Sequence, residues 1–312
     1  MVEPMKVVVA GASGLVGSAL VPALRDAGHE GVGLGRRAGV GIEPWDPAAA
    51  VLDPAVLEGA GAVVNLAGAG IADGRWTAAR QAEILDSRVR STRLLVDTMT
   101  RVSTRPEVFV CASASGYYGD CGERVVAEDA PAGDGFLAGV CRRWEAEARG
   151  AEALGIRVVL MRLGVVLTPR GGALAKMLPV FRAGLGGPAG SGRQWTSWMS
   201  IDDVVAAFCH AMSSASVEGP VNTTSPMPVR NREFAQALGR VLGRPAALPA
   251  PSTALRLMFG RMAEETILQS ARLVPARLSA SGFSCRFPDI EAALRHVLAG
   301  EVAAAPRGDR TR

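Results

Sequence analysis

Positions 6–28 of the chain read KVVVAGASGLVGSALVPALRDAG. The apolar run Lys6 to Ala10 predicts a buried strand, and the segment Leu15 to Ala27 predicts a helix. The intervening GASGLVG has glycines at every third position, which allow a tight turn and a close approach of the backbone to a ligand. Free N–H groups and the positive dipole at the start of the helix favour an anion. The segment therefore predicts a phosphate-binding turn.

Short apolar runs alternate with helical patterns through the first half of the chain, as in successive βαβ units. The fold class that follows is α/β, a Rossmann doubly wound parallel sheet with a smaller C-terminal substrate lobe and a helical tail. Further strands are expected at His29 to Leu34, Ala62 to Leu66, Val108 to Ala112, Arg157 to Met161 and Pro220 to Asn222, and long helices around Leu85 to Met99 and Phe136 to Leu154.

Glycine and proline become dense from Pro169 to Gly192, where the regular alternation stops. We therefore expect a Rossmann domain at 1–168, with strands and helices returning to it from about 196–225. A substrate-side lobe is expected at 169–247, a small C-terminal helical domain at 248–298, and a disordered tail at 299–312.

Composition limits the function classes. The 312 residues carry a formal charge of +4 with no basic run interleaved with aromatics, which argues against nucleic-acid binding. Five cysteines form no C-x-x-C pair, so we expect reduced thiols in the cytoplasm and no metal site. No long apolar run predicts a membrane span or signal peptide. The expected partner is a small molecule, and the sequence leaves the oligomeric state open.

The end of the second expected strand indicates which dinucleotide binds. NAD-binding sites usually have an acidic residue there, which accepts hydrogen bonds from the ribose hydroxyls. This chain has Gly35-Arg36-Arg37 instead. Two guanidinium groups can bind a 2′-phosphate through charge-assisted hydrogen bonds, so we predict NADP(H) over NAD(H). The alternative is that both arginines are ordinary solvated loop residues.

Several motifs together resemble the extended short-chain dehydrogenase/reductase superfamily, and more narrowly its atypical epimerase-like family, which includes sugar-nucleotide epimerases and cell-division-inhibitor-like proteins. They are the glycine turn, Asn65-Leu66-Ala67-Gly68, Asp86-Ser87-Arg88, Ser113 to Gly119, Phe136 to Glu145, Leu185 to Trp195 and a small C-terminal domain from about 248 to Leu298. The expected cofactor-binding residues are Gly11, Ser13, Gly14, Leu15, Val16, Gly17, Arg36, Arg37, Asn65, Leu66, Ala67, Gly68 and Arg88. An ordinary helix-surface role for Arg88 remains an alternative.

The catalytic motif of that superfamily is absent from this chain. Its members use a serine or threonine, a tyrosine and a lysine four residues after the tyrosine, which lowers the pKa of the tyrosine and holds the nicotinamide ribose. The only lysines here are Lys6 and Lys176, so no Tyr-x-x-x-Lys pair exists. Alignment on Glu145 leaves Leu137 and Cys141 in the two positions.

Three residues remain as catalytic candidates: Ser113, which matches the superfamily's serine, and Tyr117 and Tyr118, either of which could donate a proton. The alternative is that Tyr117-Tyr118-Gly119 is only a packing and turn element.

The segment GRQWTSW at positions 192–198 combines a guanidinium, an amide and two indoles, a set that suits a small-molecule pocket. We therefore expect substrate-binding roles for Arg193, Trp195 and Trp198. The alternative is that both tryptophans belong to the core. Asp202 is expected to be the N-cap of the helix that follows.

Two functions are consistent with these residues. The first is an NADP(H)-dependent oxidoreductase or epimerase acting on a small molecule. The second, suggested by the missing Tyr-Lys pair, is a catalytically inactive NADPH-binding sensor or regulatory protein.

Overall fold

A computed structural model describes residues 3–302 of the chain. Its centre is one large sheet with the strand order β12-β8-β6-β5-β1-β2-β3-β4, in which every pair is parallel except β3 with β4. The strands are β12 (Gly219–Thr223), β8 (Arg157–Leu163), β6 (Val108–Ala114), β5 (Ala62–Asn65), β1 (Lys6–Ala10), β2 (Glu30–Gly35), β3 (Ile42–Asp46) and β4 (Val51–Leu52). The chain order reverses at β1, as in Rossmann sheets.

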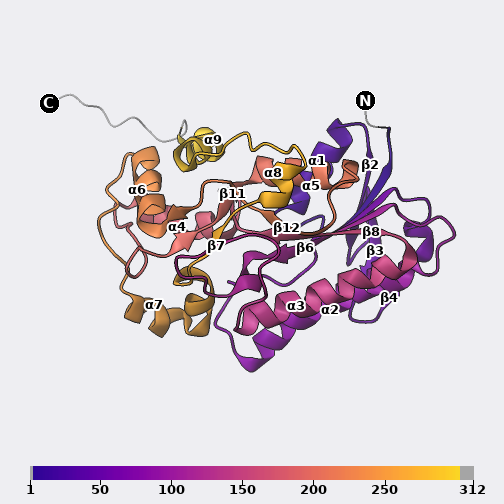
Figure 1. Ribbon diagram of the computed structural model, residues 1–312, viewed down its shortest axis with the longest axis horizontal. Helices are drawn as coiled ribbons and strands as arrows, with labels where there is room; N and C mark the ends of the chain where they lie inside the picture. The colour runs from indigo at the N-terminus through magenta and orange to yellow at the C-terminus, as the bar shows by residue number, and fades with distance from the viewer. Residues whose placement is uncertain (1–2, 303–312) are drawn as a thin grey trace.

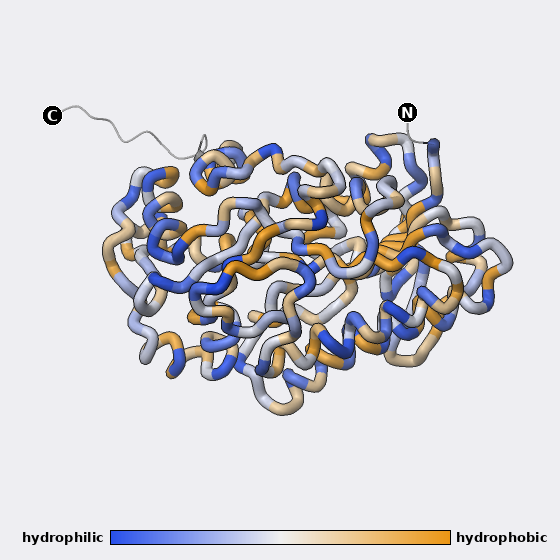
Figure 2. The backbone as a smooth tube through the Cα atoms, in the orientation of Figure 1, coloured by the Kyte–Doolittle hydropathy of each residue, from blue (hydrophilic) through white to orange (hydrophobic). Residues whose placement is uncertain are grey.

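Helices cover both faces of this sheet, which confirms the doubly wound fold class (Figure 1). On one face, α1 (Gly17–Asp26) and α5 (Ile201–Ser213) pack on β1 and β12 in one hydrophobic cluster. On the other face lie α2 (Ala78–Met99) and α3 (Phe136–Arg149), which runs on into η3 (Gly150–Leu154). Figure 2 shows hydrophobic residues concentrated along the central strands.

A third hydrophobic cluster fills the lobe that follows the sheet. It joins α4 (Gly172–Arg182), α6 (Asn231–Leu242) and α9 (Ile290–Val302), so the end of the chain shares a core with the preceding lobe. The expected disordered tail, 299–312, overlaps the end of α9 and otherwise lies outside the described residues.

Short elements connect the lobe to the sheet. Three small ladders pair β9 with β11, β10 with β13, and β7 with β14. These elements are β7 (Val125–Val126), β9 (Val165–Leu167), β10 (Trp195–Thr196), β11 (Trp198–Ser200), β13 (Val229–Arg230) and β14 (Arg272–Leu273); the remaining helices are η1 (Pro54–Val56), η2 (Ser115–Tyr118), α7 (Ser252–Phe259), η4 (Ala263–Ile267) and α8 (Ala276–Ala280).

Two local predictions were wrong. The N-cap of α5 is Ser200, whose hydroxyl accepts from the Asp203 amide, whereas Asp202 lies in the first turn and contacts His296. The first helix begins at Gly17 rather than at Leu15, because residues 11–16 form the turn that leads from β1 into α1.

Candidate functional site

The carboxyl ends of β2, β1, β5 and β6 meet along one edge of the sheet. The register places Ala10 of β1 beside Leu34 of β2 and beside Asn65 of β5, and Asn65 beside Cys111 of β6. Ligands of open α/β sheets bind at such an edge, next to the point where the strand order reverses. The expected cofactor segments after β1, β2 and β5 are therefore brought together here.

The glycine turn after β1 is shaped by close backbone contacts. A Cβ at Gly17 would lie 2.2 Å from the Gly11 carbonyl oxygen, and a Cβ at Gly11 would lie 2.7 Å from the Leu66 carbonyl carbon. Gly11 also has a φ of +78°, which disfavours other residues. Any side chain at these two positions would push the turn apart.

The same turn presents open hydrogen-bond donors. Val16, the N-cap of α1, offers no side-chain acceptor to the helix. The Ser18 and Ala19 amides already donate to the Gly14 and Val16 carbonyls, so among the described residues the amides left for a ligand are those just before them, at positions 15–17. Ser13 and Gly14 are exposed, whereas the Val16 side chain is buried in the core and Leu15 packs against Gly171 and Gly172 of the lobe. This cradle fits a pyrophosphate bound at a helix N-terminus.

Two exposed arginines follow β2 directly. Among the described residues, neither Arg36 nor Arg37 has an acidic or hydrogen-bonding partner for its guanidinium group. Both groups are therefore available to an anion at the β2 end of the edge.

The loop after β5 is held by a buried asparagine. Asn65 donates to Thr92 Oγ1 at 2.8 Å and accepts from the Ala67 amide at 3.1 Å, so its side chain organises the loop. Gly68 is exposed, and Leu66 and Ala67 are half-buried. Arg88 of α2 lies against Gly68, with its guanidinium carbon 3.0 Å from the position of an added Cβ.

A buried ion pair lies behind the carboxyl ends of β6 and β8. Arg162 of β8 donates from Nε and Nη2 to the two carboxylate oxygens of Glu145 in α3, each at 2.8 Å. The Ser113 hydroxyl donates to the same carboxylate at 2.6 Å. Arg162 also donates to the Tyr118 hydroxyl at 2.8 Å, and that hydroxyl donates to Asn222 at 2.7 Å. The five side chains form one closed network.

This network determines what the catalytic candidates can do. Ser113 and Tyr118 are each 2% exposed and already hydrogen-bonded within it. Burial raises the pKa of Tyr118 to about 12, which makes it a poor proton donor at neutral pH. For Tyr118 the structure favours the alternative of a packing role.

Tyr117 differs from its neighbour. Its side chain is half-buried and its ring lies against the Arg162 guanidinium, 3.5 Å from centroid to carbon. Among the described residues its hydroxyl has no hydrogen-bond partner. Leu137 and Cys141 are both buried, and burial raises the pKa of the Cys141 thiol to about 11. Of the candidates, only the Tyr117 hydroxyl is uncommitted.

The expected substrate-binding residues are not all in one place. Trp198 is fully buried in the core of the lobe, so it does not form a pocket wall and this prediction needs correction. Trp195 is half-buried between the guanidinium groups of Arg230 and Arg272, which lie 4.1 and 4.2 Å from its ring centroid. Its indole N–H donates to Glu123.

Arg193 is exposed beside this cluster, and its carbonyl accepts from Arg230. Arg230 is already paired with the Glu123 carboxylate at 2.7 Å, so of the two guanidinium groups at the Trp195 ring only that of Arg272 is left among the described residues to bind an anionic group.

Sequence reasoning missed Arg162, Asn222 and Arg272. Arg162 did give a signal, because a charged residue within the apolar strand RVVLMRL needs a buried partner. Asn222 and Arg272 reach the site only through tertiary packing.

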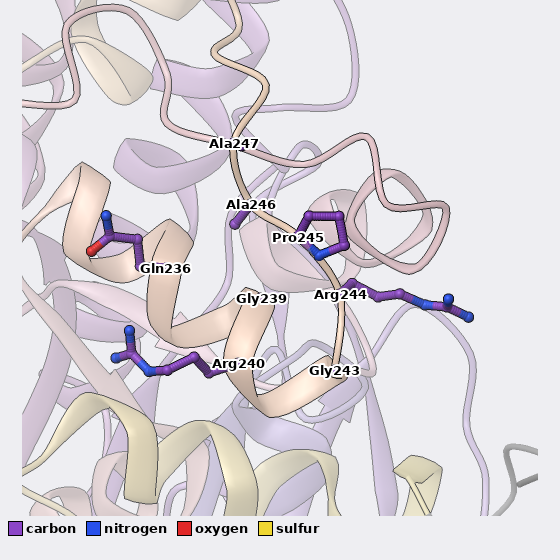
Figure 3. Close-up of a pocket in the computed structure, with 8 residues that line it drawn as sticks. All are labelled: Gln236, Gly239, Arg240, Gly243, Arg244, Pro245, Ala246 and Ala247. Carbon is purple, nitrogen blue, oxygen red and sulfur yellow. The ribbon is translucent and has the colours of Figure 1, made fainter. Parts of the chain in front are cut away.

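A pocket of about 510 Å³ lies elsewhere, at the C-terminal end of α6 (Figure 3). Its lining includes Gly239, Gly243 and Pro245, and α6 lies at the left end of the molecule in Figure 1, away from α1. Arg240 and Arg244 also line this pocket, but Arg240 is already paired with Glu291. Because the carbonyl end of a helix disfavours phosphate, the glycine turn at the edge of the sheet is the better dinucleotide site.

Other site types find no support within residues 3–302. That part of the chain has no cluster of possible metal ligands and no helix long and apolar enough to cross a bilayer. All five cysteines are free thiols.

Comparison with known proteins identifies the family. Residues 7–222 match the NAD dependent epimerase/dehydratase family, and residues 250–297 match a domain of unknown function, DUF1731. The chain belongs to the NAD dependent epimerase/dehydratase family. The resemblance inferred from the sequence, including the small C-terminal domain, is thereby confirmed.

Relatives in this family match nearly the whole chain. The epimerase family protein MT2273 of Mycobacterium tuberculosis is 44% identical over 290 residues, 92% of this chain and 96% of that protein. Human epimerase family protein SDR39U1 is 38% identical and is matched over 100% of its length, with 95% of this chain covered.

Two solved structures are similar to nearly the whole chain. The crystal structure of human SDR39U1 (isoform 2) with NADPH has a TM-score of 0.87 at 36% identity, covering 95% of this chain and 99% of that one. A nucleoside-diphosphate sugar epimerase from Corynebacterium glutamicum gives 0.77 at 34% identity, covering 95% of this chain and 58% of that one.

The buried phenol of Tyr118 leads to a prediction about alkaline stability. Its folded pKa of about 12 exceeds the ordinary value of 10.0, so its stabilising contribution is present below pH 10 and is lost as the pH rises through 12. This difference in pKa corresponds to about 2–3 kcal/mol in the free energy of unfolding. Tyr118→Phe should cost about 1–3 kcal/mol at pH 7, because Arg162 and Asn222 lose a partner.

Urea unfolding of both proteins from pH 7 to 12 measures this. The two free energies of unfolding should converge above pH 10, since the variant lacks the phenol that must stay neutral. Curves that remain parallel to pH 12 would show that Tyr118 ionises as readily in the fold as in the unfolded chain.

Proposed function

We propose that this protein binds NADPH and NADP⁺ in preference to NADH and NAD⁺. The observation that carries the proposal is the pair Arg36 and Arg37 at the end of β2, exposed and without a protein partner among the described residues. The adjacent glycine cradle suits the pyrophosphate, and the human relative at 36% identity was crystallised with NADPH. An unpaired guanidinium pair beside a phosphate site suits a 2′-phosphate.

We further propose that the protein is an oxidoreductase or epimerase acting on a small molecule in the cytoplasm. The bound dinucleotide would supply or accept a hydride. Tyr117 would exchange a proton with the substrate, because its hydroxyl is the uncommitted one beside the network. Arg193 and Arg272, at the Trp195 cluster, would hold an anionic group of the substrate.

A second candidate is an NADPH-binding sensor without turnover. It is favoured by the commitment of Ser113 and Tyr118 to the buried network and by the buried Leu137 and Cys141 in the two positions of the missing pair. A protein of this kind would keep the cofactor site and have no proton donor of its own.

Replacing Arg36 by aspartate tests the cofactor preference. Arg36→Asp should weaken NADPH binding roughly 10- to 100-fold, because a charge-assisted contact to the 2′-phosphate is lost and a like charge is introduced. NADH affinity should stay the same or improve. Titration calorimetry of both cofactors measures this, with Arg244→Asp as the control, since Arg244 is exposed at the far pocket. An undiminished preference for NADPH in Arg36→Asp would remove the assignment.

Turnover separates the two candidates. Net oxidation of NADPH over a broad panel of small carbonyl compounds reports an oxidoreductase, and loss of the starting stereoisomer without net NADPH oxidation reports an epimerase. Both are measured with Ser113→Ala and Tyr117→Phe beside the wild type. If Tyr117 is the proton donor, Tyr117→Phe should lower kcat roughly 10²-fold or more while NADPH affinity is kept. Ser113→Ala should act more weakly, through Glu145. Tight NADPH binding with no turnover on any compound would favour the sensor.

A further inference from the structure

Arg88 carries a charge that the protein does not balance. Its guanidinium lies between Gly68 and the Trp144 ring, 5.1 Å from the ring centroid. Its Nη1 donates to the carbonyls of Ala69 and Ile84 at 3.0 and 2.9 Å. Among the described residues no carboxylate pairs with it, and its Nε and Nη2 have no protein acceptor.

The surroundings of Arg88 disfavour its charge. Burial lowers its pKa, and the positive charge of Arg80 lowers it further. A largely buried cation with no counter-charge is costly, and such groups are normally paired. The acidic neighbour on the same helix, Asp86, is already bound to Arg90. The side chain is still partly exposed, so its Nε and Nη2 are open to an acceptor from outside the chain.

The position of Arg88 indicates which part of a bound dinucleotide would supply that acceptor. The sheet order runs β2, β1, β5, β6 along the carboxyl edge. With the 2′-phosphate at Arg36 after β2 and the pyrophosphate at the turn after β1, the other half of the molecule continues over β5 and β6. Arg88 lies beside Gly68, just after β5.

The same side chain is close to the end of β6. The charge of Arg88 acts on the Cys141 thiol, which donates to the Ala114 carbonyl at 3.8 Å. The Arg88 guanidinium also lies 5.1 Å from the centroid of the Trp144 ring of α3, so its charge is placed between α2 and α3.

We propose that Arg88 of α2 binds the nicotinamide-ribose half of NADP(H). The inference rests on the proposed NADP(H) site. Nε and Nη2 would donate to the ribose hydroxyls or to the phosphate oxygens next to that ribose.

Two ligands of different length test this assignment. NADPH contains both halves, whereas adenosine 2′,5′-bisphosphate has the adenosine half and lacks the nicotinamide ribose. Dissociation constants for both are measured by calorimetry on the full chain. Arg88→Met should weaken NADPH binding roughly 10- to 100-fold and leave the bisphosphate unchanged. Arg88→Lys should recover part of the loss.

Matched variants make the result specific. Arg90→Met, on the exposed side of the same helix, should change neither affinity. Arg36→Asp should weaken both ligands, because both carry the 2′-phosphate. Unchanged bisphosphate binding by Arg88→Met also shows that the variant folds.

Either of two outcomes would overturn the inference about Arg88 and leave the proposed NADP(H) site intact. Equal losses for both ligands would place Arg88 at the adenosine half or in the folding of the site, and unchanged NADPH binding would make it a packing residue. If the wild-type protein binds neither ligand, the proposed NADP(H) site fails as well.

Discussion

The buried ion pair between Arg162 and Glu145 is the constraint on which the site depends. It joins the strand β8 to the helix α3 at the carboxyl edge of the sheet, with both side chains almost completely buried. Removing one partner of such a pair typically costs about 3–5 kcal/mol, because the other charge is left alone in the interior. Ser113 and Tyr118 complete the hydrogen bonds of the pair, so their hydroxyls are committed to structure.

Because the Ser113 and Tyr118 hydroxyls are hydrogen-bonded within this network, other side chains must take part in any reaction. In the superfamily that the sequence resembles, the serine, tyrosine and lysine lie around the reacting centre. Here the corresponding region holds a closed charge network and two buried, unreactive side chains, Leu137 and Cys141. The polar groups that remain open there include Tyr117, whose ring lies against Arg162, and Arg88 from the neighbouring helix. The glycine turn of a dinucleotide site is thus combined with side chains at the other end of the edge that differ from the superfamily's serine, tyrosine and lysine.

The sequence predicted those parts of the fold that local pattern determines. The glycine turn is contiguous in the sequence, so it was recognisable without the structure. Gly17 is required by contacts within the turn itself, and Gly11 by contacts with the loop after β5. The strands β3 and β4 were missed because β3 contains Pro44 and two acidic residues and is mostly exposed, which hides its period-2 pattern.

The candidate site was harder to predict, for a physical reason. Whether Trp198 lines a pocket or fills a core depends on α4, α6 and α9, which come from distant parts of the chain. The pairing of Arg162 with Glu145, and of Tyr118 with Asn222, likewise depends on how α3 and β12 pack. Residue types at a given spacing do not contain that information.

We propose that this carboxyl edge holds NADP(H) in one orientation, from two arginines after β2 to a third arginine on α2. A crystal structure of the protein with NADP⁺ tests it most directly. The 2′-phosphate should lie within hydrogen-bond distance of Arg36 or Arg37, the pyrophosphate on the turn from Gly11 to Gly17, and the nicotinamide ribose beside Arg88. A dinucleotide bound with its 2′-phosphate away from both arginines, or with its nicotinamide half away from β5 and β6, would contradict it.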